Sequence, residues 1–225
     1  MRHARRSGAL HVLRKAERQN VRKPLNKNYS VFLNIPYDKP FENLYLAYIV
    51  GLVELGLTPK VTLGITDGTA RIDRIFELLK SCRYSVHDLS RVEIDRKPPP
   101  TPRFNMPFEL GLAFAWSRLT PANHDFFVFE SVNRRAQKSL SDLSGTDFNI
   151  HDCTAKGIMR ELRNAFARRE NRPTVPRMME SYKELIRSLP ALRKAAGTAD
   201  LFQAGIFNDI VTTSTLRRNS SRPSH

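Results

Sequence analysis

The chain has 225 residues, of which 40% are hydrophobic and 26% charged, with only 2 Cys. This is the composition of a globular protein, and it excludes collagen-like, low-complexity and disulfide-scaffold classes. No apolar run approaches the roughly 20 residues that a membrane-spanning helix needs, and the first residues are too charged for a signal peptide, so we expect a soluble, cytoplasmic protein that contacts no membrane.

The formal net charge is +15, and most of it lies at the two ends of the chain. Residues 1–28 hold nine Lys and Arg against one acid, and residues 217–225 hold three Arg and no acid. We interpret residues 1–28 as a flexible basic arm and residues 217–225 as a basic tail. Such segments keep a protein soluble or bind nucleic acid weakly and without sequence preference, through counterion release.

Short β-prone apolar runs alternate with helical apolar spacing over residues 29–170. Strands are expected over residues 29–35, 60–63, 83–88, 126–129 and 148–151. Helices are expected over residues 41–56, 72–79, 106–118, 137–143 and 155–169, with Gly56 ending the first of them. The proline-rich stretch Lys97 to Pro102 is expected to be a loop.

This alternation predicts an α/β fold: a flavodoxin-like (Rossmannoid) five-stranded parallel sheet flanked by helices, within residues 29–170. Two more helical patterns, near residues 178–189 and 201–211, predict a helical extension over residues 171–216. Two amphipathic helices cannot bury their apolar faces alone. We therefore expect them to pack on the α/β domain or to form a homo-oligomer with a second subunit.

The motifs of dinucleotide oxidoreductases, P-loop NTPases, zincins and α/β-hydrolases (GxGxxG, GxxxxGK[ST], HExxH and GxSxG) do not occur in the sequence. Cys82 and Cys153 belong to no CxxC or Cys/His cluster, so we expect no metal and no cofactor. His87 is interpreted as a satisfied core residue. Asp142 and His151 are interpreted as an orienting pair or a structural hydrogen bond.

Polar residues fall where the predicted strands end, and open parallel sheets bind ligands at that edge. Asn34 and Asp38 follow the first strand, Asp88 ends the third, and Glu109 is expected in the first turn of the helix over residues 106–118. There the helix dipole would keep the Glu109 carboxylate ionised, as a nucleophile or an oxocarbenium stabiliser requires. Acids are favoured in the first turn of any helix, however, and Asp88 or Ser90 can equally cap a turn, so structural roles stay open.

Three segments carry a resemblance to the superfamily that joins TIR domains with nucleoside 2-deoxyribosyltransferase-like proteins, closest to standalone bacterial nucleotide-binding TIR-like members. They are Val31-Phe-Leu-Asn-Ile-Pro-Tyr, Tyr84-Ser-Val-His-Asp-Leu-Ser and Asn105-Met-Pro-Phe-Glu-Leu-Gly-Leu-Ala. Phe-Glu-Leu-Gly-Leu-Ala at residues 108–113 matches the motif that holds the family's catalytic Glu. The resemblance covers about residues 29–152.

The resemblance implies cleavage or transfer at an N-glycosidic bond of NAD, a nucleoside or a nucleotide, with Glu109 as the catalytic residue. It also implies that Asp88 orients the ribose hydroxyls and that Asn34 and Tyr37 line the rim. Arginines around the proline-rich stretch suit a phosphate-bearing substrate. The residues predicted to bind the ligand are Asn34, Pro36, Tyr37, Asp38, Asp88, Ser90, Arg91, Arg103 and Asn105.

Two alternatives remain beside this enzymatic reading. In the first, the chain is a non-catalytic nucleotide-sensing or protein-interaction module in bacterial defence or signalling. In the second, it is a nucleic-acid-associated protein that binds through its basic tails.

Overall fold

The computed structural model describes residues 29–63, 68–92, 94–95, 97–143, 145–170 and 172–220. The predicted basic arm, residues 1–28, lies outside these ranges. Its expected binding to nucleic acid therefore stays a prediction. None of the helices in the described part of the chain combines the length and apolarity that a membrane crossing requires.

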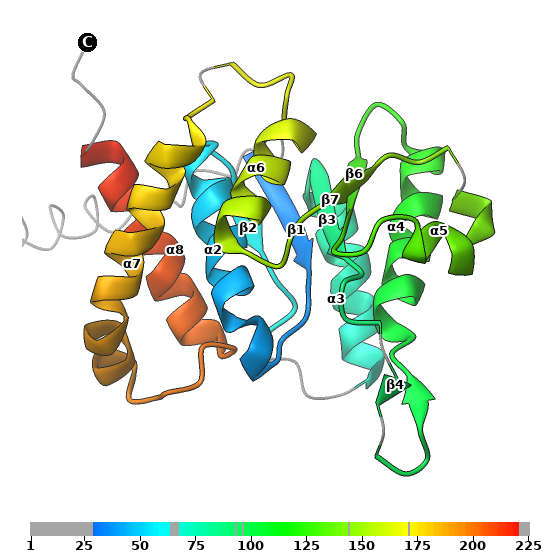
Figure 1. Ribbon diagram of the computed structural model, residues 1–225, viewed down its shortest axis with the longest axis horizontal. Helices are drawn as coiled ribbons and strands as arrows, with labels where there is room; N and C mark the ends of the chain where they lie inside the picture. Colours follow the sequence, from blue (N-terminus) through cyan, green and yellow to red (C-terminus); the bar gives the residue numbers. More distant parts are fainter. Residues whose placement is uncertain are drawn as a thin grey trace, which may run out of the picture.

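A five-stranded, fully parallel sheet forms the centre of the fold (Figure 1). Its strands are β1 (Ser30–Asn34), β2 (Thr58–Lys60), β3 (Tyr84–Asp88), β6 (Asp125–Glu130) and β7 (Phe148–Ile150). Their order across the sheet, β2-β1-β3-β6-β7, is the flavodoxin-like order in which the chain reverses direction next to the first strand. The predicted fold class is confirmed.

The second strand differs from its predicted position. It spans Thr58–Lys60, whereas residues 60–63 were expected, and Pro59 pairs with Val31 of β1. A proline inside an apolar run argues against a central strand, because proline has no N–H to donate to a neighbouring strand. Strand β2 lies at the edge of the sheet, where a proline is tolerated.

Helices cover both faces of the sheet (Figure 1). They are α2 (Glu42–Glu54), α3 (Gly68–Ser81), α4 (Asn105–Leu119), α5 (Arg135–Ser139), α6 (Ala155–Ala165), α7 (Val175–Ala196) and α8 (Ala204–Ser220). Short 3-10 helices span Lys39–Phe41 and Ser141–Leu143. Apolar residues of α3, α4 and α5 pack on one face, and those of α2, α6, α7 and α8 share a single core cluster with the other face.

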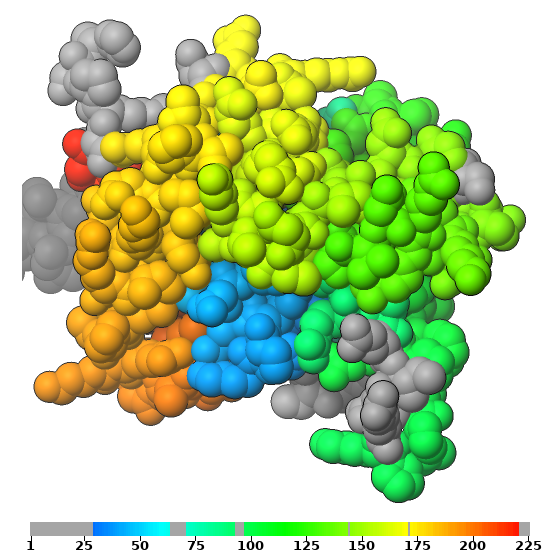
Figure 2. Space-filling model, in the orientation of Figure 1, coloured from blue at the N-terminus to red at the C-terminus, as the bar shows by residue number. Residues whose placement is uncertain are grey.

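Helix α2 is enclosed on all sides. Every residue from Leu44 to Glu54 is buried, because α2 is apolar around its whole circumference and so needs partners beyond the sheet. The C-terminal helices α7 and α8 supply them, and Phe202, in the turn between the two helices, places its ring 5.1 Å from that of Tyr45. Figure 2 shows the yellow and orange residues of α6 and α7 around a small visible blue area near the start of α2. The C-terminal extension thus finds a packing partner within its own chain.

The end of α2 follows the sequence prediction. Gly56 adopts a left-handed conformation (φ 76°), and the Leu57 N–H bonds the Leu52 carbonyl, which closes the helix. Two distant arginines also donate to its last carbonyls: Arg218 Nε to Glu54 O and Arg169 Nε to Leu55 O. Since α8 continues to Ser220, Arg217 and Arg218 are helical and do not belong to a tail that begins at residue 217.

Two segments are more ordered than expected. The proline-rich stretch is not a plain loop, because its last two residues form β5 (Thr101–Pro102), which pairs antiparallel with β4 (Ile94–Asp95). The helix expected over residues 137–143 is divided into α5 and the 3-10 helix Ser141–Leu143. Of these two segments, the first borders the candidate site through Thr101 and Pro102 of β5.

Candidate functional site

A pocket of about 540 Å³ opens where the chain reverses direction, at the carboxyl ends of β1 and β3. We call it the switch-point pocket. Ligands of open α/β sheets bind at this position because the loops that leave neighbouring strands there diverge and form a crevice. Its lining residues are Ile35, Pro36, Tyr37, Arg71, Arg91, Thr101, Pro102, Arg103, Phe104, Asn105 and Met106.

The structure brings many of the predicted ligand-binding residues together in this pocket. Pro36 and Tyr37 follow β1, Arg91 follows β3, and Arg103 and Asn105 lie at the junction of β5 and α4. These residues come from segments up to about 70 positions apart in the sequence, as the parallel topology predicts.

Asp38 lies beside the pocket and holds two of its arginines. Its Oδ2 is 2.9 Å from Arg103 Nη1 and 3.1 Å from Arg91 Nη2. Asp38 Oδ1 is buried and has no hydrogen-bond partner among the described residues. One carboxylate therefore holds two guanidinium groups that line the pocket. An incoming anion would compete with Asp38 for them.

Glu109 forms an ion pair with Arg71, a residue of α3 that sequence reasoning did not select. The distance from Arg71 Nη2 to Glu109 Oε1 is 2.9 Å, and the Glu109 side chain is 4% exposed. Arg71 itself lines the switch-point pocket. No local pattern identifies Arg71, because its partner lies 38 residues further along the chain, on a different helix.

The position of Glu109 corrects one expectation. Helix α4 begins at Asn105, so Glu109 lies in its second turn, and the first turn contains no acid. The dipole therefore does not control its ionisation, since that effect is confined to the first turn. Burial raises the pKa of Glu109 above its ordinary value, and the neighbouring Arg71 guanidinium opposes this rise. Oε2 of Glu109 is buried without a hydrogen-bond partner in the described part of the chain.

Tyr37 links the pocket to this ion pair. Its hydroxyl donates to the Leu33 carbonyl at 3.1 Å. Burial raises the pKa of Tyr37 well above its usual value, and a hydrogen bond with Thr62 opposes this rise; the Glu109 charge adds a smaller increase and Arg71 a smaller decrease. The phenol is thus a neutral hydrogen-bonding group beside Arg71 and Glu109.

Asp88 and Ser90 do not line the switch-point pocket. Asp88 is fully buried: its Oδ1 accepts the Ser90 N–H at 2.8 Å, and its Oδ2 accepts the Tyr48 hydroxyl at 2.7 Å. His151 Nε2 lies 3.2 Å from the same Oδ2 without forming a hydrogen bond, and no contact joins His151 to Asp142 in the described part of the chain. A ligand hydroxyl would have to displace one of these contacts in order to reach Asp88.

Asn34 begins a buried chain of hydrogen bonds that crosses the sheet. Asn34 Nδ2 donates to His87 Nδ1 at 3.0 Å, His87 Nε2 contacts Ser85 Oγ, and Ser85 Oγ contacts His124 Nε2, both at 2.9 Å. His124 Nδ1 donates to the Cys82 carbonyl at 3.0 Å. Neutral imidazoles with protons on His87 Nε2 and His124 Nδ1 give each of the four ring nitrogens a hydrogen-bond partner of the right kind. His87 is a satisfied core residue, as interpreted from the sequence.

The chain of imidazoles predicts an acid-sensitive stability. Burial, with a smaller contribution from His124, lowers the pKa of His87 to about 3. In the unfolded chain the pKa is about 6.5, so between about pH 6.5 and 3 only the unfolded state takes up this proton, and stability falls as the pH falls.

We expect His87 to contribute a slope of at most about 1.4 kcal/mol per pH unit over this window. Urea unfolding of the wild type and of His87→Gln at several pH values measures it. The difference in unfolding free energy between the two proteins should shrink below pH 6.5 and stay constant above it. Parallel stability curves across pH 4 to 7 would contradict the assignment.

Within the described ranges, no group of three or more His, Cys, Asp or Glu side chains is placed to hold a metal ion.

The fold and the pocket define a flavodoxin-like α/β protein with a basic cavity at its topological switch point. Comparison of the chain with protein-family models, with curated proteins and with solved structures found no match.

Proposed function

We propose that the switch-point pocket binds a nucleotide or a related phosphorylated ribosyl compound. The observation that carries this proposal is the gathering of Arg71, Arg91 and Arg103 at the carboxyl edge of β1 and β3. Guanidinium groups match phosphate oxygens in charge and in geometry. Asn105 and Thr101 add polar groups suited to hydroxyls, and the volume suits a ligand of nucleotide size.

The reaction we propose at this site is cleavage of the N-glycosidic bond through Glu109. The C1′–N bond breaks, its electron pair leaves with the base, and the Glu109 carboxylate stabilises the oxocarbenium ion or forms an ester at C1′. Water then adds at C1′, which breaks the C1′–O bond to Glu109 where an ester has formed, and the proton that water loses passes to the departed base or to solvent. Two facts support the assignment: Glu109 contacts a residue that lines the pocket, and one of its oxygens has no partner among the described residues.

The burial of Glu109 favours a second candidate, a nucleotide sensor that binds without cleavage. Incubation of the purified protein with NAD and a panel of nucleotides, followed by chromatography, separates the two. Release of nicotinamide or a free base supports cleavage. Binding with no product supports the sensor, and absence of binding overturns both.

Asp38→Asn is expected to tighten the binding of a phosphorylated ligand about three- to tenfold. The substitution frees Arg91 and Arg103 from an acid that competes with the phosphate, and exposed ion pairs of this kind contribute at most about 1 kcal/mol each. Calorimetric titration of AMP measures the change.

Glu42→Gln is the matched control, because Glu42 pairs with Lys39 and Arg193, neither of which lines the pocket. Its affinity for AMP should equal that of the wild type. Weaker binding by Asp38→Asn would show that Asp38 contacts the ligand itself and does not compete with it.

A further inference from the structure

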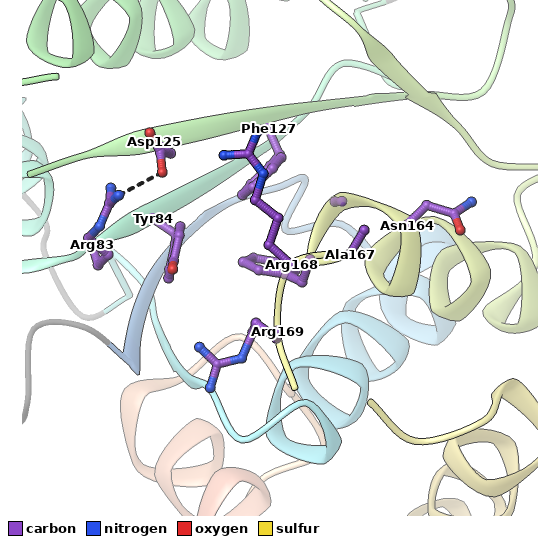
Figure 3. Close-up of a pocket in the computed structure, with 10 residues that line it drawn as sticks. Arg83, Tyr84, Asp125, Phe127, Asn164, Ala167, Arg168 and Arg169 are labelled. Carbon is purple, nitrogen blue, oxygen red and sulfur yellow. Dashed lines mark ion pairs between the residues drawn. The ribbon is translucent and has the colours of Figure 1, made fainter. Parts of the chain in front are cut away.

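A second pocket, of about 490 Å³, opens at the opposite edge of the sheet. We call it the amino-edge pocket, because Tyr84 and Asp125, the first residues of β3 and β6, line it. Residues 164–169, at and beyond the end of α6, form its other wall (Figure 3). It shares no lining residue with the switch-point pocket.

Positive charge is in excess here. Arg83, Arg168 and Arg169 line the amino-edge pocket, and Asp125 is its only acidic lining residue among those described. Figure 3 shows the three arginines around Tyr84, with Arg83 reaching toward Asp125. Arg83 Nη2 lies 2.8 Å from Asp125 Oδ2, so Asp125 neutralises one of the three guanidinium groups at most.

The bonding capacity of these arginines is only partly used. Arg83 Nη1 is buried and has no hydrogen-bond partner among the described residues. Arg168 is exposed and lacks a hydrogen-bond or ion-pair partner within the same ranges. Arg169 donates through Nε to Leu55 O, and its guanidinium lies over the Tyr29 ring. Buried polar groups in native proteins are normally paired, so an unpaired guanidinium N–H in a basic cavity points to an anion.

The floor of the pocket is aromatic. The Phe166 ring lies 5.2 Å from that of Tyr84 and 4.8 Å from that of Phe127, so the three rings form one cluster. Tyr84 and Phe127 are partly exposed. Guanidinium groups beside exposed ring surface suit a ligand that joins a phosphate to an apolar or aromatic group.

We infer that the amino-edge pocket is a second ligand site, which binds a small phosphorylated compound with an aromatic group, of mononucleotide size. Arg168 and Arg83 contact the phosphate, and the aromatic floor contacts the ring. The site is independent of the switch-point pocket, and it requires neither cleavage nor nucleotide binding there.

The test is calorimetric titration of AMP, adenosine and inorganic phosphate into five full-length proteins: the wild type, Arg168→Glu, Arg83→Gln, Arg103→Glu and Arg187→Glu. Arg187 is exposed and lines neither pocket, so it controls for the change in overall charge. In the Arg103→Glu protein, which lacks an arginine of the switch-point pocket, AMP should still bind at the amino edge. Arg168→Glu should weaken the binding of AMP to the amino-edge pocket about tenfold or more, and Arg187→Glu should leave this affinity unchanged.

AMP should also bind the amino edge more tightly than either adenosine or phosphate alone. If Arg168→Glu and Arg83→Gln both titrate like Arg187→Glu, the inferred site does not exist, provided that thermal unfolding shows each variant folded. Adenosine binding as tight as AMP binding would also overturn it. If Arg103→Glu binds AMP like the wild type while Arg168→Glu no longer binds it, the amino-edge site stands and only the switch-point proposal is wrong.

Discussion

Replacement of Glu109 by Gln should abolish N-glycosidic cleavage while leaving the fold and ligand binding nearly intact. The amide keeps the shape of the side chain but removes the negative charge that would stabilise the oxocarbenium ion or attack C1′. Loss of one preorganised electrostatic group costs a factor of about 100 to 1,000 in rate, and loss of a nucleophile costs more. Turnover of NAD or a nucleotide and the melting temperature are measured on the same preparation.

Glu77→Gln is the matched control, since Glu77 forms an exposed ion pair with Arg74 and should keep full activity. Arg71 supplies a second readout. Because Arg71 lowers the pKa of Glu109, Arg71→Gln should raise that pKa and move the acid limb of the rate profile to higher pH. A Glu109→Gln protein that is destabilised but fully active would reduce Glu109 to a structural residue.

Deletion of the chain after Arg172 should prevent folding. This truncation removes α7, α8 and the turn between them, whose buried side chains belong to the main core around α2. They are Met178, Leu185, Leu189, Leu201, Ile206, Phe207 and Ile210. Each contributes about 1.5–3 kcal/mol on burial, and a domain of this size has a total stability of only about 5–15 kcal/mol. We expect an aggregated product without a cooperative melting transition. A soluble fragment that melts cooperatively would show that the extension is an appendage.

A single substitution tests the same packing. Ile210 is fully buried and Leu216 is 62% exposed, although both lie on α8. Ile210→Asp should cost several kcal/mol because it buries a carboxylate in the cluster around α2, whereas Leu216→Asp should cost less than about 0.5 kcal/mol. Equal melting temperatures for the two variants would contradict the packing of α8.

The architecture was predictable because it depends on local patterns. Alternation of apolar strands with amphipathic helices specifies a parallel sheet, and residues after parallel strands meet at one edge. This is why Pro36, Tyr37, Arg91, Arg103 and Asn105 could be expected together from the sequence. The end of α2 was also predictable, since Gly56 takes a conformation that favours glycine.

The remaining features depend on tertiary contacts. Arg71 could not be selected because only the packing of α3 against α4 places it beside Glu109. Asp88 looks like a ligand-binding acid in the sequence, yet Tyr48 and His151 reach it from segments 40 and more residues away. Glu109 was expected in the first turn because the sequence predicts a helix that begins at residue 106, whereas α4 begins at Asn105.

The central claim is that the switch-point pocket binds a nucleotide, and an NMR titration of the labelled protein with AMP and NAD tests it most directly. Amide signals of Tyr37, Arg71 and Asn105 should shift in a saturable manner as the ligand binds beside them. The same shifts should be lost in the Arg91→Gln/Arg103→Gln double variant, since both substituted arginines line the pocket. Shifts confined to other parts of the molecule, or unchanged in the double variant, would contradict the claim.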